Sequence, residues 1–164
     1  MRMTLVLVGA ALVAMLLQTT VAAALTPATE VVPNLVLILV VYLGLRHHGV
    51  GGVAGAFLLG YCLDTFSGTL LGVHAAACTA AYVVAYLIAR TLWTEDGLPA
   101  MMVVFLAALV YTVVAYGVVV LVDRAWPGWV VVVRRGLVQA TLATLLTPWM
   151  FRLVHWERRL LRLT

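Results

Sequence analysis

Charged side chains are scarce in this sequence, and lysine is missing altogether. Only 10% of the 164 residues are charged, whereas 65% are hydrophobic. A water-soluble domain of this size needs more charge to cover its surface, so the composition excludes a soluble protein and indicates an integral membrane protein. All ten basic residues are arginines that stand at the ends of apolar runs, where they can reach lipid headgroups. The net charge of +4 therefore reports membrane topology and does not form a patch for nucleic acid.

Several signatures of enzymes and metal sites are also missing. The sequence contains no Gly-x-Ser-x-Gly, no phosphate-binding loop, no His-Glu-x-x-His and no Cys-x-x-Cys. Its two cysteines, Cys62 and Cys78, fall inside apolar runs, so we expect both to be unpaired and to pack as small hydrophobes. We therefore predict no catalytic residue, no cofactor and no metal ligand, and we do not expect an enzyme.

Six apolar runs predict an all-α polytopic membrane bundle with six transmembrane helices. The second run is short for a hydrocarbon core of about 30 Å, so we expect a thinner bilayer or neighbouring helices to shield its ends. The sixth is placed from Gly136 onward because an earlier start would carry Arg134 and Arg135 into the bilayer, and Pro148 is expected to bend it. The expected spans are 3–25, 33–45, 50–66, 70–89, 99–122 and 136–155, within a single domain over 1–164.

The arginines also predict the orientation of the chain. With an uncleaved first helix and six spans, both termini lie on one side, and the positive-inside rule makes that side cytoplasmic. The basic C-terminal tail is suited to lying on anionic lipid. The arginines expected on the cytoplasmic face are Arg2, Arg46, Arg90, Arg152, Arg158, Arg159 and Arg162, against Arg124, Arg134 and Arg135 on the other face.

Small residues are concentrated in one stretch, residues 51–74. The positions that recur there every four residues are Gly52, Ala56, Gly60, Asp64, Gly68 and Gly72. The first four lie near one line along a helix, and in lipid such a line lets two helix backbones approach closely. We therefore expect this small-residue stripe to pack against another helix of the same chain.

Ionisable residues near the outer ends of the spans are the strongest candidates for chemistry. Asp64 and His74 flank the turn between the third and fourth spans, so we expect them to pair as a structural clamp, with a titrating functional pair as the alternative. Asp64 and Asp123 leave open an intramembrane aspartic hydrolase, in which two carboxyl groups share a proton. The sequence departs from lipoprotein signal peptidases, however, because it lacks their asparagine three residues before the first aspartate and their Phe-Asn before the second.

Polar side chains on the first and sixth spans are candidate contacts for a partner helix. The threonines of the sixth span, including Thr147, are expected to bond to their own helix or to a neighbour. The tyrosines are expected to fill the bundle. The candidate partner contacts are Gln18, Thr19, Thr20, Thr141 and Thr144.

Residues 33–74 resemble the rod shape-determining protein MreD family. The resemblance lies in the order and spacing of four elements. These are Pro33-Asn34-Leu35-Val36-Leu37-Ile38-Leu39-Val40-Val41-Tyr42-Leu43, then Gly55-Ala56-Phe57-Leu58-Leu59-Gly60, then Asp64 with Ser67-Gly68, then Leu71-Gly72-Val73-His74-Ala75. The sequence departs from the family at Asn34, where an aspartate often follows the proline.

The resemblance implies a non-enzymatic subunit of the bacterial cell-elongation machinery in the inner membrane. Such a subunit binds MreC, a single-span protein, and through it supports regulation of peptidoglycan synthesis by the class B penicillin-binding protein and its glycosyltransferase partner. The implied fold resembles the substrate-binding subunits of energy-coupling-factor transporters. The alternative is such a vitamin-binding subunit itself, which needs a pocket with several convergent polar groups. The polar residues available in the outer half are Gln18, Asp64, His74, Asp123 and the nearby tyrosines.

Overall fold

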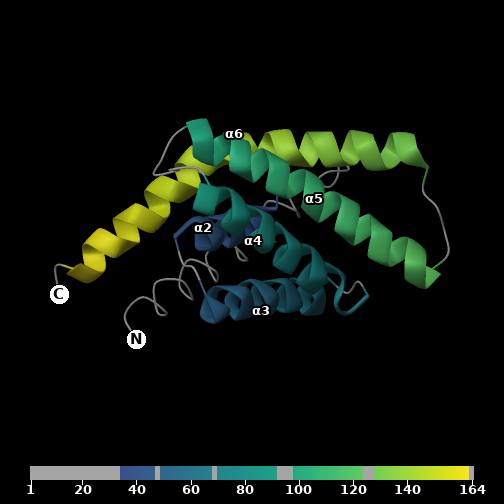
Figure 1. The fold of residues 1–164 in the computed structure, drawn as a ribbon, viewed down its shortest axis with the longest axis horizontal. Coiled ribbons are helices and arrows are strands. Elements are labelled where there is room, and N and C mark those ends of the chain that lie inside the picture. Colours follow the sequence, from purple (N-terminus) through teal and green to yellow (C-terminus); the bar gives the residue numbers. More distant parts are fainter. Residues whose placement is uncertain (1–33, 47–48, 68–69, 92–97, 124–127, 163–164) are drawn as a thin grey trace.

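Every element in the described part of the chain is an α-helix (Figure 1). The computed structural model describes residues 34–46, 49–67, 70–91, 98–123 and 128–162. The helices are α2 (Leu35–Arg46), α3 (Val50–Ser67), α4 (Val73–Thr91), α5 (Leu98–Asp123) and α6 (Trp129–Arg162). The all-α prediction is confirmed for these residues. The predicted first span, 3–25, lies outside them, so the count of six spans stays a prediction.

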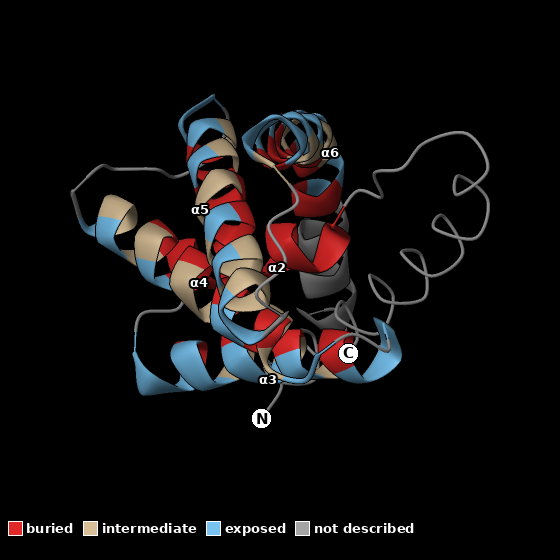
Figure 2. Cartoon of the chain, turned by 90° about the vertical axis from the view of Figure 1, so that its right-hand side faces the viewer, coloured by how far each residue is buried: buried red, intermediate tan, exposed pale blue. Residues whose placement is uncertain are grey.

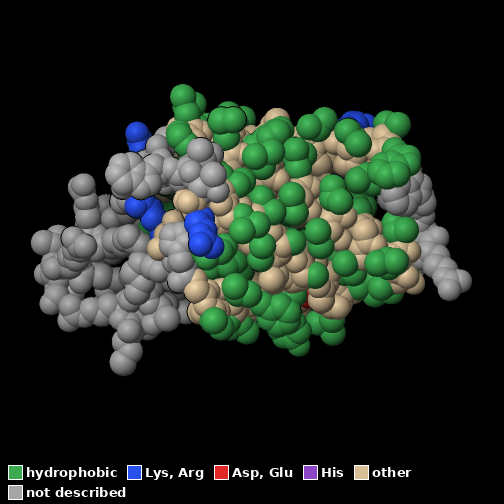
Figure 3. Space-filling model, in the orientation of Figure 1, with side chains coloured by type: hydrophobic (Ala, Val, Ile, Leu, Met, Phe, Trp, Pro, Cys, Tyr) green, Lys and Arg blue, Asp and Glu red, His purple; other side chains and the backbone are tan. Residues whose placement is uncertain are grey.

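Four of the five helices are long and apolar enough to cross a bilayer. The apolar segments are Val50–Ser67, Val73–Arg90, Leu98–Val122 and Trp129–Arg152. Figure 3 shows hydrophobic side chains over the face in view, with arginines only toward its two ends. An exposed surface of this kind is stable in lipid and not in water, so the structure agrees with the composition in indicating a membrane protein.

The long helices are arranged in chain order, and α2 lies among them. α3 packs on α4, α4 on α5 and α5 on α6, while α2 contacts all four (Figure 1). Figure 2 shows the consequence for burial, because α3, α4 and α5 each expose one face whereas α2 is buried all round. The core of the described bundle is therefore built around α2.

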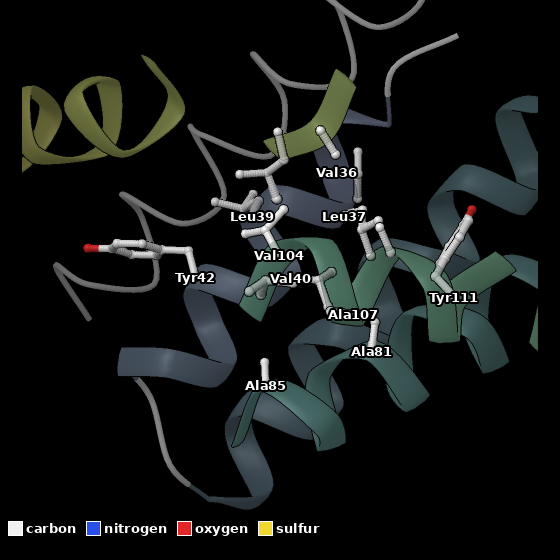
Figure 4. Close-up of a cluster of buried hydrophobic side chains, with 14 of the residues drawn as sticks. Val36, Leu37, Leu39, Val40, Tyr42, Ala81, Ala85, Val104, Ala107 and Tyr111 are labelled. Carbon is white, nitrogen blue, oxygen red and sulfur yellow. The ribbon is translucent and has the colours of Figure 1, made fainter. Parts of the chain in front are cut away.

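Helix α2 is too short to cross the membrane alone. Its 12 residues rise only about 18 Å, and all from Leu35 to Leu45 are buried. Figure 4 shows Leu37 and Val40 beside Ala107 of α5, with Ala81 of α4 nearby. A helix that is apolar on every side needs such enclosure. Shielding by neighbouring helices, expected for this short run, is confirmed.

Helix α6 begins seven residues before the predicted start of the sixth span at Gly136, so the helix extends beyond that span. The helix starts at Trp129 and continues without a break through Arg134 and Arg135 to Arg162. Gly128, at φ 87°, begins its first turn, and the Val132 N–H donates to the Gly128 carbonyl at 3.3 Å. Arginines near a helix end can extend their side chains toward headgroups, so they need not end the helix. Figure 1 shows α6 changing direction in its C-terminal half, which contains Pro148 and agrees with the predicted bend.

Candidate functional site

The small-residue stripe lies on the buried face of α3 and brings this helix against α4. Gly52, Ala56, Gly60 and Asp64 are all buried there. A Cβ added at Gly60 would lie 2.5 Å from the carbonyl oxygen of His74 and 2.6 Å from the Cα of Ala75. Close helix packing within the chain, expected from the four-residue spacing, is therefore present at Gly60. Because the opposing atoms belong to the backbone, only glycine fits at this position.

Asp64 caps the start of α4 from the neighbouring helix. Its Oδ1 accepts the His74 N–H at 2.9 Å, and its Oδ2 accepts the N–H groups of Gly72 at 2.9 Å and Ala75 at 3.1 Å. The first N–H groups of a helix have no partner within it, and the positive end of the helix dipole favours a carboxylate. Gly72, at φ +99°, adopts the left-handed conformation that glycine allows in this turn. The side chain of Asp64, only 1% exposed, thus joins α3 to α4.

The predicted pairing of Asp64 with His74 occurs through the backbone of His74 and not through its ring. The imidazole Nδ1 instead lies 2.6 Å from the hydroxyl of Tyr111 on α5. The two rings are nearly parallel, with centroids 6.0 Å apart and an interplanar angle of 6°. The expected clamp across the α3–α4 turn is therefore made by the carboxylate alone, while the His74 ring ties α4 to α5.

Asn34 connects the group formed by Asp64, His74 and Tyr111 to the short central helix α2. Its Oδ1 accepts the Leu37 N–H at 3.1 Å, which makes it the N-cap of α2, and its side chain lies close enough to the Tyr111 hydroxyl to interact with it. Helix α2 accordingly begins at Leu35, two residues later than predicted. We define the polar cluster as Asn34, Asp64, His74 and Tyr111. It takes one residue from each of α3, α4 and α5 and the capping residue of α2, and only His74 is more than slightly exposed.

The arrangement of the polar cluster favours one tautomer of His74. Since the Asn34 oxygen accepts the Leu37 N–H, its amide N–H is the group available to donate to the Tyr111 oxygen. With that donor in place, we expect the Tyr111 O–H to donate to His74 Nδ1, which would leave the imidazole proton on Nε2.

We expect ¹⁵N NMR of histidine-labelled protein to show His74 as the Nε2–H tautomer at neutral pH. Tyr111→Phe removes the donor to Nδ1 and should allow the Nδ1–H tautomer to appear, while lowering the free energy of unfolding by about 1–3 kcal/mol because buried groups lose their partner. Tyr116→Phe is a suitable control, since Tyr116 lies further along the same helix and is half-buried. A wild-type His74 spectrum dominated by Nδ1–H would contradict this assignment.

The hydrogen bonds of the polar cluster join the helices of the bundle to one another. Both oxygens of Asp64 are already bonded to backbone N–H groups, so neither is placed as an acid or a base. The side chain of Asp123 lies outside the description, so the aspartate dyad is not tested. Within the described ranges, no three His, Cys, Asp or Glu side chains gather as a metal site. Cys62 and Cys78 are both free thiols, as predicted.

The threonines of α6 bond to their own helix, as expected. Thr141, Thr144 and Thr147 donate to the carbonyls of Val138, Ala140 and Ala143 at 2.9, 2.7 and 2.8 Å. Thr141 is exposed and Thr144 half-buried, so their proposed contact with a partner stays a prediction. The other candidates, Gln18, Thr19 and Thr20, lie outside the described residues.

Two members of the polar cluster, Tyr111 and Asn34, were not predicted from the sequence as functional candidates. Tyr111 was expected only to fill the bundle, and nothing local marks it, because its partner His74 is 37 positions away. Asn34 carried a usable signal, since an asparagine directly before an apolar run is typical of a helix N-cap. That signal predicts the bond to Leu37 but not the contact with Tyr111.

Comparison with known protein families identifies a family of membrane proteins. The family model of the rod shape-determining protein MreD matches residues 1–156 of the chain. No curated protein and no solved structure matches it.

Proposed function

Because the chain belongs to the rod shape-determining protein MreD family, we propose that it is the inner-membrane subunit of the cell-elongation machinery that binds MreC. Through MreC it supports regulation of the class B penicillin-binding protein and its glycosyltransferase partner. The family is one of shape-determining membrane proteins and is not known for catalysis, so the proposed role is non-enzymatic.

Beside the family, the observation that supports this proposal is that the described polar side chains bond mostly to partners within the chain. The polar cluster and the α6 threonines bond within the chain, whereas the exposed helix faces are apolar. Binding to a membrane partner would then depend on close packing of helices, with polar contacts contributing about 0.6–2 kcal/mol each.

The vitamin-binding alternative is not favoured. Of the polar residues that could line a pocket, Asp64 is bonded to backbone N–H groups and His74 to Tyr111. A vitamin-sized site needs several polar groups that converge on the ligand. Among the described residues, these two side chains are instead satisfied by the protein.

Co-purification tests the proposal. Tagged protein co-expressed with MreC of the same organism should retain MreC in mild detergent, and raising the salt concentration should change the yield little, because packing and not ion pairing holds the two together. A matched sample without MreC is analysed by mass spectrometry for a bound vitamin. Loss of MreC together with a stoichiometric vitamin would reject the proposal in favour of a transporter subunit.

Cysteine labelling tests the proposed topology of six spans with cytoplasmic termini. In a background with Cys62 and Cys78 replaced by alanine, single cysteines at Thr29, Gly97 and Thr164 should react with a membrane-impermeant reagent in intact cells only at Thr29. Permeabilised cells, in which all three should react, provide the control. Labelling of Gly97 or Thr164 in intact cells would overturn the orientation.

A further inference from the structure

The first turns of α6 combine a shallow apolar groove with one exposed arginine. The groove has a volume of about 580 Å³ and is lined by Trp129, Val130, Val133, Arg134, Leu137 and Val138. The opposite side of the helix packs inward, because a Cβ on Gly136 would lie 2.9 Å from Thr112 of α5. The groove therefore faces away from the bundle.

Two arginines bracket the apolar part of α6. At 1.5 Å per residue, Arg134 lies about 27 Å along the helix from Arg152, close to the thickness of a hydrocarbon core of about 30 Å. Both side chains are exposed. If Arg152 lies at one membrane boundary, Arg134 lies at the other, at the level of the lipid phosphates. Leu137 and Val138 then extend from that level into the hydrocarbon.

The described part of the protein supplies no counter-charge for Arg134. The structure shows no hydrogen bond or ion pair between Arg134 and a described side chain. Asp64, the one acidic residue whose side chain is described, is buried and bonded to backbone N–H groups, whereas the side chains of Asp123 and Glu157 lie outside the description. A guanidinium at the edge of the hydrocarbon requires an anion, and a phosphate accepts two parallel hydrogen bonds from it.

We propose that this groove binds one phospholipid. The lipid phosphate bonds to the Arg134 guanidinium, and an acyl chain lies along the apolar side chains of Leu137 and Val138. Trp129 flanks the headgroup, at the interfacial depth that tryptophan favours. The charge of Arg134 and the apolar lining together select a lipid and not a free anion.

Native mass spectrometry of delipidated protein tests this site with defined probes. Phosphatidylglycerol should bind at a first site with one-to-one stoichiometry, and Arg134→Gln should weaken that site about fivefold, the effect of one arginine near an anionic lipid. Diacylglycerol with the same acyl chains should bind the wild type and Arg134→Gln equally weakly. Arg90→Gln, which removes an exposed arginine at the end of α4, should bind phosphatidylglycerol as the wild type does.

Three results would overturn the proposal. Arg134→Gln could bind phosphatidylglycerol as tightly as the wild type, or diacylglycerol could bind as tightly as phosphatidylglycerol. Millimolar inorganic phosphate could also displace the lipid, which would reveal a simple anion site. Arg134→Lys keeps the charge but not the paired donors, so it should fall between the wild type and Arg134→Gln. Matching thermal melts of all variants would show that their folds are intact.

Discussion

Replacing Gly60 with alanine is expected to lower the free energy of unfolding by about 3 kcal/mol, at the upper end of the range for overpacked cores. The added Cβ would lie 2.5 Å from the His74 carbonyl oxygen and 2.6 Å from the Cα of Ala75. Backbone atoms cannot rotate aside as a side chain can, so α3 and α4 must separate. Gly60→Leu should lower the free energy of unfolding further, and we expect this variant to express poorly.

The measurement for Gly60 is unfolding in a denaturing detergent titration, with Gly51→Ala as its matched control. Gly51 lies on the same helix, is exposed, and has no atom within 4 Å of an added Cβ. Its replacement should be neutral or stabilise the helix by up to about 1 kcal/mol, since alanine favours helix over glycine. Equal stability of Gly60→Ala and the wild type would mean that α3 does not approach α4 closely.

Removing the carboxylate of Asp64 is expected to have an effect of similar size. Asp64→Ala leaves three backbone N–H groups without acceptors where α3 meets α4. The loss at Ala75 is buried and costs about 1–3 kcal/mol, whereas the losses at Gly72 and His74 are part-buried and cost less. Asp64→Asn should lower the free energy of unfolding by less, about 1–3 kcal/mol. Both carboxylate oxygens accept bonds, so an amide nitrogen in place of either one would face a donor.

The control for Asp64 is Thr65→Ala, one position further along α3. The Thr65 hydroxyl is exposed and donates only to the Tyr61 carbonyl of its own helix, so its loss should change stability by less than about 0.5 kcal/mol. Unfolding and complementation of rod growth should be measured together. If Asp64→Asn is folded and retains MreC yet fails to support rod growth, the carboxylate has a role beyond capping α4.

The sequence predicted which elements approach one another better than which atoms bond. The spacing of Gly52, Ala56 and Gly60 could be recognised directly because a four-residue repeat places small residues on one helix face. The partners of Asp64 could not, since they are backbone N–H groups and every residue has one. Proximity of Asp64 to position 74 was therefore predictable, whereas the choice of the His74 N–H over its ring depends on how α4 begins.

The positions of charge and helix ends show a second limit of sequence reasoning. Treating Arg134 and Arg135 as too polar for the hydrocarbon put the predicted start of the sixth span at Gly136, whereas the helix already begins at Trp129. A mean cost for an arginine in lipid neglects the length of its side chain, which can carry the charge outward from a helical backbone. The end of α3 was predicted more closely, at residue 66 against the observed Ser67.

The enclosure of α2 constrains how the protein is made. A segment of 12 residues is too short to partition into the bilayer as an independent span, and α6, one of the helices that surrounds it, is synthesised after the other described helices. During translation α2 must therefore wait at the translocon or in an incomplete bundle until about the last fifth of the given sequence emerges. Nascent chains that end before Trp129 would expose an apolar, unanchored segment, which is the kind of intermediate that quality-control proteases remove.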